Sequence, residues 1–394
     1  MNKKSRDIFL LALSTGTSTF GSAMSMIFIP LLIYTETHNP LLTSFQVAIN
    51  AIGNIFACQL INRLKIAHND KQALIRCNVI LSIVILSAIL IPKPYFIIYL
   101  YLLTFFVAIL GSIARGYYES LIGSICSDYD VNRQYVVAKC KTFENIGTIL
   151  GSCITGPLLM LNTYYVAFLI DFSSYLAAAC ISIYIYCNGY SFSHNTKGTK
   201  GISILFSDEF KNLSVAHGFT AGALFLMNGS VIYVMKDYYH VQNAFISFYY
   251  VSQFIFGLLG SVLILYISKN KKLSISNGQV LRLAYLLPFF IIGVTDNLYL
   301  FILCISLLAT VHSFSIPLWQ SFFQDCATDS SQLRLIGTAR KTFVSIIGAV
   351  ASLIAGVLLL YLKYQYIYLI AALCCFISYL YSSTIAKKQG ALSV

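Results

Sequence analysis

The sequence predicts an all-α membrane protein with twelve transmembrane helices, arranged as two parallel repeats of six. Of its 394 residues, 58% are hydrophobic and only 10% are charged, whereas a soluble domain carries about 25% charged residues. Twelve apolar runs have the length of about 20 residues that a helix needs to cross a bilayer. A stretch of the first half also recurs in the second half at an offset of 200 residues.

The repeat is clearest where Lys141–Leu159 (KTFENIGTILGSCITGPLL) is written over Lys341–Leu359 (KTFVSIIGAVASLIAGVLL). Nine of the nineteen positions are identical, beginning with Lys-Thr-Phe, and the same offset pairs Tyr164 with Tyr364. Apolar composition produces chance matches of Leu and Ile, but not Lys-Thr-Phe in register with a serine and a glycine. We therefore interpret the halves as structural repeats of about 200 residues.

The apolar runs define the expected helices in chain order. Those of the first half are roughly 8–34, 42–62, 74–92, 95–125, 137–161 and 164–187. Those of the second half are roughly 213–236, 243–267, 278–295, 297–325, 337–362 and 364–386. The first run is too long for a signal peptide and has no small-residue cleavage site, so we interpret it as a helix. The sequence thus predicts six-helix bundles at 1–187 and 213–394, joined by a polar linker at 188–212.

Basic residues predict the orientation of the chain. If the N-terminus is cytoplasmic, only Lys93, Lys236 and Lys363 fall outside, and Arg115 lies within a helix. The other 22 of the 26 Lys and Arg residues, Arg282 among them, then lie at or near the inner side. This separation predicts twelve helices with both termini in the cytoplasm. It also explains the net charge of +12 without a nucleic-acid partner.

Motifs for covalent or metal chemistry are absent from the sequence. The eleven cysteines lie mostly in apolar runs and form no C-x-x-C pair, and the six histidines are scattered. Neither H-E-x-x-H nor G-x-S-x-G occurs, and no phosphate-binding G-x-x-x-x-G-K-[ST] loop is present. We expect no enzyme activity, no cofactor and no metal site, and uphill transport would use an ion gradient.

Four ionisable residues inside predicted helices are candidates for coupling or cavity charges: Arg115, Glu119, Glu144 and Asp171. Arg115 and Glu119 share a helix face at i, i+4, and Glu144 is expected near the depth of Arg115. We predict that Arg115 faces the interior of the first half and pairs with Glu119 or Glu144. The alternative is an arginine that extends to the inner interface. For Glu144, a structural partnership with Arg115 or Lys141 is an alternative to coupling, and for Asp171 the alternative is packing or gating.

Polar and aromatic side chains in other helices suit a mixed substrate cavity, although hydrogen bonding between helices is an alternative role for each. They are Asn50, Asn54, Asn228, Gln253, His312, Trp319 and Gln320. Near the predicted cytoplasmic ends, the candidate gate residues are Asn62, Arg63, Lys141 and Lys341. The two lysines are repeat counterparts, and topology anchoring is their alternative role.

Two six-helix halves with a longer cytoplasmic loop between them resemble the major facilitator superfamily. Within it the chain is similar to bacterial macrolide-efflux and enterobactin-export proteins. The matching stretches are GSIARGYYESL at 111–121, GSCITGPLL at 151–159 and AFLIDFSSYLAAA at 167–179. In that family the loop between helices two and three usually reads Gly-x-Leu-x-Asp-Arg. Here Gln59 and Asn62 replace the usual Gly and Asp, so the charge that latches the cytoplasmic side in the family is missing.

The resemblance implies a secondary transporter of the bacterial inner membrane that works as a monomer by alternating access. The implied activity is export of a small amphipathic compound, of the drug or siderophore class, in exchange for protons. One alternative is a transporter of a lysophospholipid-like lipid. Another is a membrane protein that binds or senses a ligand without moving it.

Overall fold

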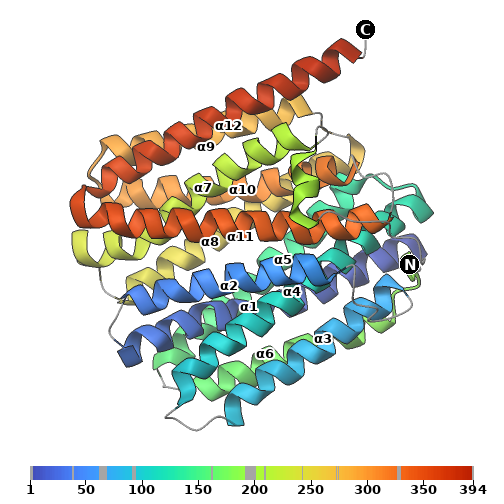
Figure 1. Ribbon diagram of the computed structural model, residues 1–394, viewed down its shortest axis with the longest axis horizontal. Coiled ribbons are helices and arrows are strands. Elements are labelled where there is room, and N and C mark those ends of the chain that lie inside the picture. The colour runs from blue at the N-terminus through green and yellow to red at the C-terminus, as the bar shows by residue number, and fades with distance from the viewer. Residues whose placement is uncertain are drawn as a thin grey trace. The chain divides into compact units, whose positions relative to one another are not determined.

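The computed structural model is all-helical, as the sequence predicts (Figure 1). It describes residues 3–37, 40–61, 69–90, 95–160, 163–190, 201–207, 210–241, 243–271, 273, 275–325 and 330–392. Within these residues the chain forms twelve α-helices, and each corresponds to one predicted apolar run. The chain divides into two compact units. Unit 1 is Met1–Ile202 with Ala327–Thr342, and unit 2 is Ser203–Cys326 with Phe343–Val394.

Unit 1 contains the first six helices and the first part of the eleventh. The six are α1 (Lys3–Thr37), α2 (Pro40–Leu60), α3 (Asp70–Leu86), α4 (Phe96–Tyr129), α5 (Arg133–Met160) and α6 (Tyr164–Ile183). Helix α1 packs against α5 and α6, α3 against α4 and α6, and α2 against α4. In Figure 1, α3 and α6 lie side by side. Buried apolar side chains such as Leu81, Leu100 and Phe168 form the core between α3, α4 and α6.

Unit 2 contains the remaining helices and repeats four of these helix pairs. Its helices are α7 (Lys211–Tyr233), α8 (Asn243–Asn270), α9 (Ile275–Val294), α10 (Leu298–Asp325) and α12 (Tyr364–Leu392), with the later part of α11 (Ser330–Tyr361). The pairs α7–α12, α9–α12, α8–α10 and α9–α10 correspond to α1–α6, α3–α6, α2–α4 and α3–α4. Helices α6 and α12 begin at Tyr164 and Tyr364, at the predicted offset of 200 residues.

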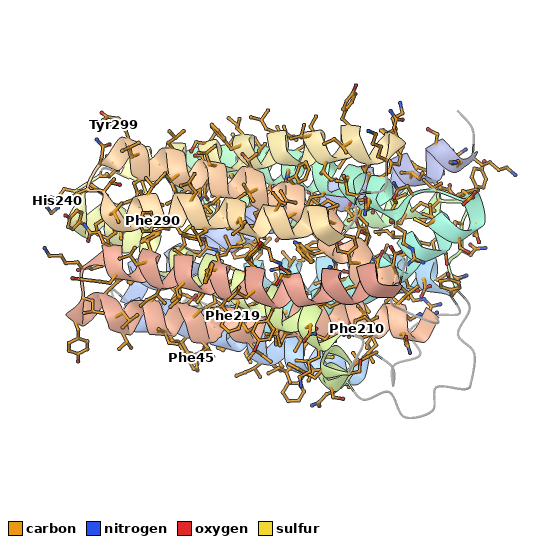
Figure 2. The ribbon with its side chains drawn as sticks, turned by 90° about the horizontal axis from the view of Figure 1, so that it is seen from above. Phe45, Phe210, Phe219, His240, Phe290 and Tyr299 are labelled. Atoms are coloured by element: carbon orange, nitrogen blue, oxygen red, sulfur yellow. The ribbon has the colours of Figure 1, made fainter. Side chains whose placement is uncertain are left out.

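The turns of unit 2 follow the up-and-down order that membrane helices require. Figure 2 shows His240, before α8, and Tyr299, at the start of α10, at the same end of the unit. Phe210, before α7, lies toward the opposite end. His240 has a positive φ of 53°, which places it in the left-handed region as the chain turns into α8.

Many of the described helices are long and apolar enough to cross a membrane, so the chain is a multi-pass membrane protein. Seven meet this criterion, within Asp70–Leu90, Phe96–Tyr129, Tyr165–Ile183, Val251–Asn270, Leu298–Asp325, Gln332–Leu359 and Tyr364–Ser383. Two shorter apolar segments are Ile49–Leu60 and Val280–Val294. Large apolar side chains stay exposed on these helices, as expected where the surrounding solvent is lipid.

Glycines let α1 and α5 approach to backbone contact. A Cβ on Gly147 would lie 2.1 Å from the carbonyl oxygen of Gly16, and one on Gly151 would lie 2.3 Å from that of Phe20. Small residues at such spacing are a common way for membrane helices to pack. Gly356 on α11 has nothing within 4 Å of its Cβ position, so it provides a matched control.

We predict that Gly147→Ala destabilises the protein by about 1–3 kcal/mol, because the added methyl group overlaps backbone that cannot rotate away. Gly356→Ala should leave stability unchanged or raise it slightly, because Ala is the better helix former. Thermal unfolding of the purified protein in detergent measures both variants. Equal melting temperatures for the two would contradict the close packing of α1 on α5.

Candidate functional site

Two basic and two acidic side chains meet between α4 and α5 inside unit 1. On α4, the Nε of Arg115 lies 3.1 Å from Oε1 of Glu119, one turn later. Across to α5, Nη1 of Arg115 lies 3.0 Å from Oε1 of Glu144, and Nζ of Lys141 lies 3.2 Å from Oε2 of the same carboxylate. The predicted ion pair of Arg115 is therefore confirmed, and it involves both glutamates.

The first part of α11 adds two more cations. Nη2 of Arg340 lies 2.6 Å from Oε1 of Glu119. The ammonium of Lys341 is directed toward α4, where it lies 3.4 Å from the Cβ position of Gly111. Among the described residues no carboxylate pairs with Lys341. We call the following six residues the central charge cluster: Arg115, Glu119, Lys141, Glu144, Arg340 and Lys341.

The central charge cluster lies deep along its helices, and several of its side chains are partly exposed. Arg115 is fourteen residues before the end of α4 at Tyr129, or about 21 Å at 1.5 Å per residue. The side chain of Glu119 is 1% exposed, whereas those of Arg115, Lys141 and Glu144 are 27%, 22% and 12% exposed. Arg115 thus pairs with carboxylates at depth, and three of the charged side chains keep some exposed surface.

The cluster carries more positive than negative charge. The cluster contains four cations and two carboxylates, which gives a net charge of +2 if all six groups are ionised. Unbalanced charge in a low-dielectric environment is costly. The arrangement therefore disfavours a permanently cationic ligand at this place.

A second ion pair joins the start of α3 to α11. Oδ1 of Asp70 accepts a hydrogen bond of 2.7 Å from Nε of Arg334, and the two side chains are 0% and 6% exposed. Oδ2 of Asp70 accepts from the hydroxyl of Ser120 at 2.8 Å and from the backbone N–H of Tyr190 at 2.9 Å. Gly189 has a φ of +75°, and a Cβ there would lie 2.6 Å from that of Asp70. Glycine is therefore needed where this segment passes the carboxylate.

Asp70 and Arg334 are not among the candidate residues that the sequence predicts. Two candidate gate residues lie outside the described residues: Asn62, which replaces the acidic latch residue usual in the family, and Arg63 beside it. The carboxylate that binds α11 is instead Asp70, eight positions later. An Asn-Asp pair at a helix start is a visible signal, since Asn69 caps α3 by accepting from the N–H of Gln72. Its partner on α11 is not visible, because it is 264 residues away.

Polar contacts continue this attachment of α11 toward α2. The hydroxyl of Thr342 donates to the carbonyl oxygen of Asn54 at 2.6 Å, and that of Thr338 donates to the carbonyl oxygen of Ser112 at 3.3 Å. The side chain of Asn54 is buried, donates to Oδ1 of Asn50 and accepts from the Ser112 hydroxyl. Asn54 is therefore occupied by contacts between helices, while Asn50 is exposed.

Asp171 lies apart from the central charge cluster, between α6 and α1. It is 1% exposed, and its Oδ2 accepts a hydrogen bond from the hydroxyl of Ser25. Its Oδ1 has no partner among the described residues and lies against Gly21, whose Cβ position is 2.4 Å away. No described cation pairs with this carboxylate. Because a lone carboxylate in such a place is costly, the geometry suits a neutral acid.

We predict that Asp171→Asn changes stability by less than about 1 kcal/mol, because an amide keeps the shape and the hydrogen bond without requiring ionisation. Asp171→Leu should lose about 1–3 kcal/mol, because it leaves the Ser25 hydroxyl without its acceptor and overpacks the space beside Gly21. Thermal unfolding in detergent measures both. A large loss in Asp171→Asn would show that the ionised form is needed.

Unit 2 buries an arginine that the charge pattern had placed near the inner side. Arg282 is 1% exposed within α9, and its guanidinium carbon lies 3.7 Å from the ring centroid of Trp319. Its Nη1 donates to the carbonyl oxygen of Ala216 at 2.7 Å, to the hydroxyl of Thr220 at 2.5 Å and to that of Ser378. The carbonyl, the hydroxyls and the aromatic face replace water around its charge.

Other predicted cavity residues of unit 2 also bond to neighbouring side chains. The hydroxyl of Tyr285 lies 3.2 Å from Nδ1 of His312 and 2.6 Å from the hydroxyl of Ser315. Nε2 of Gln253 donates to the hydroxyl of Tyr249 at 2.6 Å. His312 and Gln253 are only partly buried, so each also keeps an accessible part of its side chain.

The remaining candidates differ in their exposure. Asn228 is exposed on α7, whereas Gln320 is fully buried on α10. No group of three or more His, Cys, Asp or Glu side chains that could hold a metal ion occurs in the part of the chain that the structure describes.

Comparisons with known proteins agree with this architecture. The family profile described as Major Facilitator Superfamily matches residues 11–351. A bacterial homologue of the iron transporter ferroportin, in an outward-facing state, has a TM-score of 0.77 at 12% identity, covering 98% of this chain and 100% of that one. The human organic anion transporter MFSD10 has a TM-score of 0.75 at 10% identity, with 97% and 100% covered. The E. coli fucose:proton symporter FucP has a TM-score of 0.72 at 14% identity, with 97% and 99% covered. No curated protein matches the sequence.

Proposed function

The chain belongs to the Major Facilitator Superfamily, and from this premise we propose that it is a proton-coupled exporter of a small amphipathic compound. It is a membrane transporter rather than an enzyme. The proposed cycle is alternating access, in which two six-helix halves (1–187 and 213–394, joined at 188–212) expose one site to each side in turn. The proposed setting is a bacterial inner membrane, with both termini cytoplasmic and the chain acting as a monomer.

The observation that carries the proton-coupling proposal is the position of Glu144. Its carboxylate is held by Arg115 and Lys141, and Arg115 also contacts Glu119, which in turn binds Arg340 on α11. A proton that binds Glu144 removes the charge that holds two cations. Its effect is therefore transmitted from α5 through α4 to α11.

The direction of that effect follows from the charges. When Glu144 is neutral, Arg115 still pairs with Glu119 among the described residues, and it competes there with Arg340. The cluster then has four cations and one carboxylate, so the mutual repulsion between Arg115, Arg340 and Lys341 is less compensated. Protonation thereby weakens the attachment of α11 to α4. We propose that this step links proton binding to alternating access.

The substrate class is narrowed by the same charges. A permanently cationic drug would meet the net positive charge of the cluster, so we favour neutral or anionic amphipathic compounds, which include siderophores. The accessible parts of His312 and Gln253 in unit 2 are candidates for hydrogen bonds to such a compound.

Flux measurements in proteoliposomes test the proposal. The full chain is reconstituted, a pH gradient is imposed, and the movement of amphipathic test compounds is followed together with internal pH. Proton movement opposite to compound movement supports the exporter. Flux that ignores the gradient contradicts coupling, movement of lysophospholipid supports lipid transport, and binding without flux supports a sensor.

A further inference from the structure

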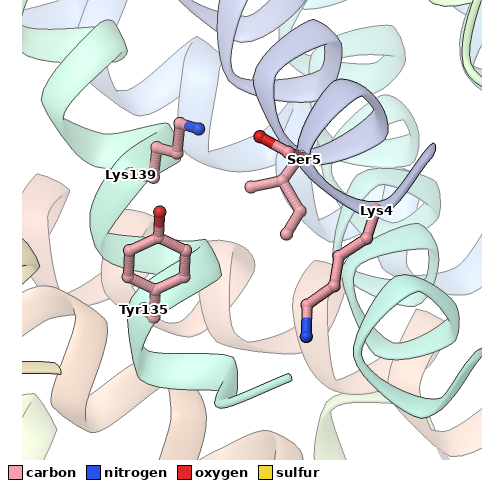
Figure 3. Close-up of a pocket in the computed structure, with 5 residues that line it drawn as sticks. Lys4, Ser5, Tyr135 and Lys139 are labelled. Carbon is pink, nitrogen blue, oxygen red and sulfur yellow. The ribbon is translucent and has the colours of Figure 1, made fainter. Parts of the chain in front are cut away.

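A small basic pocket lies between the first turns of α1 and α5. Its volume is ≈ 140 Å³, and its lining consists of Lys4, Ser5, Ile8, Tyr135 and Lys139. Figure 3 shows Tyr135 and Lys139 on α5 facing Lys4 and Ser5 on α1 across the pocket. We propose that this pocket binds the phosphate headgroup of an anionic phospholipid. The inference does not depend on the transported substrate.

The two lysines of the pocket carry unbalanced charge. Both are partly buried, and no described carboxylate pairs with either of them. Asp7 is the nearest acid along α1, but it is 0% exposed. It accepts from the backbone N–H groups of Tyr186 and Cys187 at 2.9 and 2.8 Å, so it is engaged away from the pocket. An anion from outside the chain is therefore the counter-ion that fits.

The pocket also offers neutral hydrogen-bond donors. The Tyr135 phenol and the Ser5 hydroxyl line it beside the two ammonium groups. A phosphodiester has several acceptor oxygens and no donor at physiological pH, so it can accept hydrogen bonds from these four side chains. The nearby cations Lys3 and Arg6 lie over the ring of Tyr186, at 5.6 and 4.5 Å from its centroid, and add positive potential to this end of unit 1.

The surroundings favour a lipid over a free phosphate ion. Ile8 lines the pocket, and Phe9 is 37% exposed beside it, with Nζ of Lys139 5.8 Å from its ring centroid. The apolar run of α1 begins here, so the pocket lies where the hydrocarbon region should begin. An acyl chain attached to the phosphate therefore has apolar surface to follow.

That apolar surface continues along α5. Ile146, Leu150 and Ile154 are 38%, 54% and 39% exposed, and they follow Lys139 by 7, 11 and 15 residues. Because these spacings are close to whole helical turns, the four side chains lie along one face. The stripe extends about 22 Å from the lysine at 1.5 Å per residue, which is more than the roughly 15 Å that one leaflet contributes to the hydrocarbon core.

Native mass spectrometry tests the proposal on the full chain. The protein is exchanged into detergent with an equal mixture of phosphatidylglycerol and phosphatidylcholine, and bound lipid is counted. The site variant is Lys4→Gln/Lys139→Gln. The control is Lys269→Gln/Lys271→Gln, which removes the same charge from exposed positions at the end of α8.

We expect wild type and control to retain phosphatidylglycerol preferentially, and the site variant to bind it about 30-fold more weakly, as expected for two lysines near a membrane surface. Lys4→Arg/Lys139→Arg should keep most of the affinity. Equal losses in site and control variants would overturn the proposal, since they would indicate non-specific attraction. Displacement of the lipid by inorganic phosphate at constant ionic strength would also overturn it, in favour of a free-anion site.

Discussion

Glu144→Gln should abolish proton-driven accumulation of substrate while leaving the protein folded. The amide preserves the shape of the side chain but cannot take up a proton, and it holds Arg115 and Lys141 less strongly than a carboxylate does. Arg115 keeps Glu119 as its partner. Because Glu144 is mostly buried and its charge offsets two cations, we expect a stability loss of about 1–3 kcal/mol, which a folded protein tolerates. Proteoliposome flux with and without a pH gradient measures the effect.

The controls separate coupling from loss of structure. Asp130→Asn removes one negative charge at an exposed residue after α4, whose φ of 49° Asn adopts readily, so it should transport at the wild-type rate. Glu144→Asp retains a proton acceptor and should retain gradient-driven flux at a reduced rate. If Glu144→Gln still accumulates substrate as fast as wild type, Glu144 does not couple the proton, although flux itself would still identify a transporter.

Removing either partner of the Asp70–Arg334 pair should be the most destabilising change in unit 1. Asp70→Asn removes the negative charge that Nε of the buried Arg334 binds, and Arg334→Gln leaves a buried carboxylate that still accepts from Ser120 and the Tyr190 N–H. Breaking such a pair costs about 3–5 kcal/mol. Unfolding in a denaturant series, with the protein held in a constant detergent, measures each variant.

The double variant tests whether the pair itself is responsible. Asp70→Asn/Arg334→Gln removes both charges, so it should recover a large part of the loss, since two neutral amides leave no isolated ion. The pair also connects α3 to α11. Breaking it in either single variant should therefore increase the reaction of cysteines at this end of unit 1 with a thiol-directed label. Two single-variant effects that simply add in the double variant would show that the ion pair contributes no coupling.

The positions of the helices were predictable because each depends on the sequence pattern of its own segment. Tyr164 and Tyr364 begin α6 and α12 at the offset that the repeat predicts. Each predicted apolar run corresponds to a helix of the structure. The reason is that a backbone in hydrocarbon must satisfy its own hydrogen bonds, so a long apolar stretch becomes a helix. The pairing of Arg115 with Glu119 was predictable for the same reason, since an i, i+4 spacing puts both on one face.

The sequence by itself determined that this is a twelve-helix membrane protein with two repeats and an arginine that must find an anion at depth. Only the tertiary structure decided which residues complete that arrangement. Arg340 reaches Glu119, and Arg334 reaches Asp70, across more than 200 residues. The packing of the helices also buries the guanidinium of Arg282 against Trp319 and two hydroxyl groups. The physical reason is that helix formation in lipid is set by each segment alone, whereas the partner of a buried charge is set by which helices pack together.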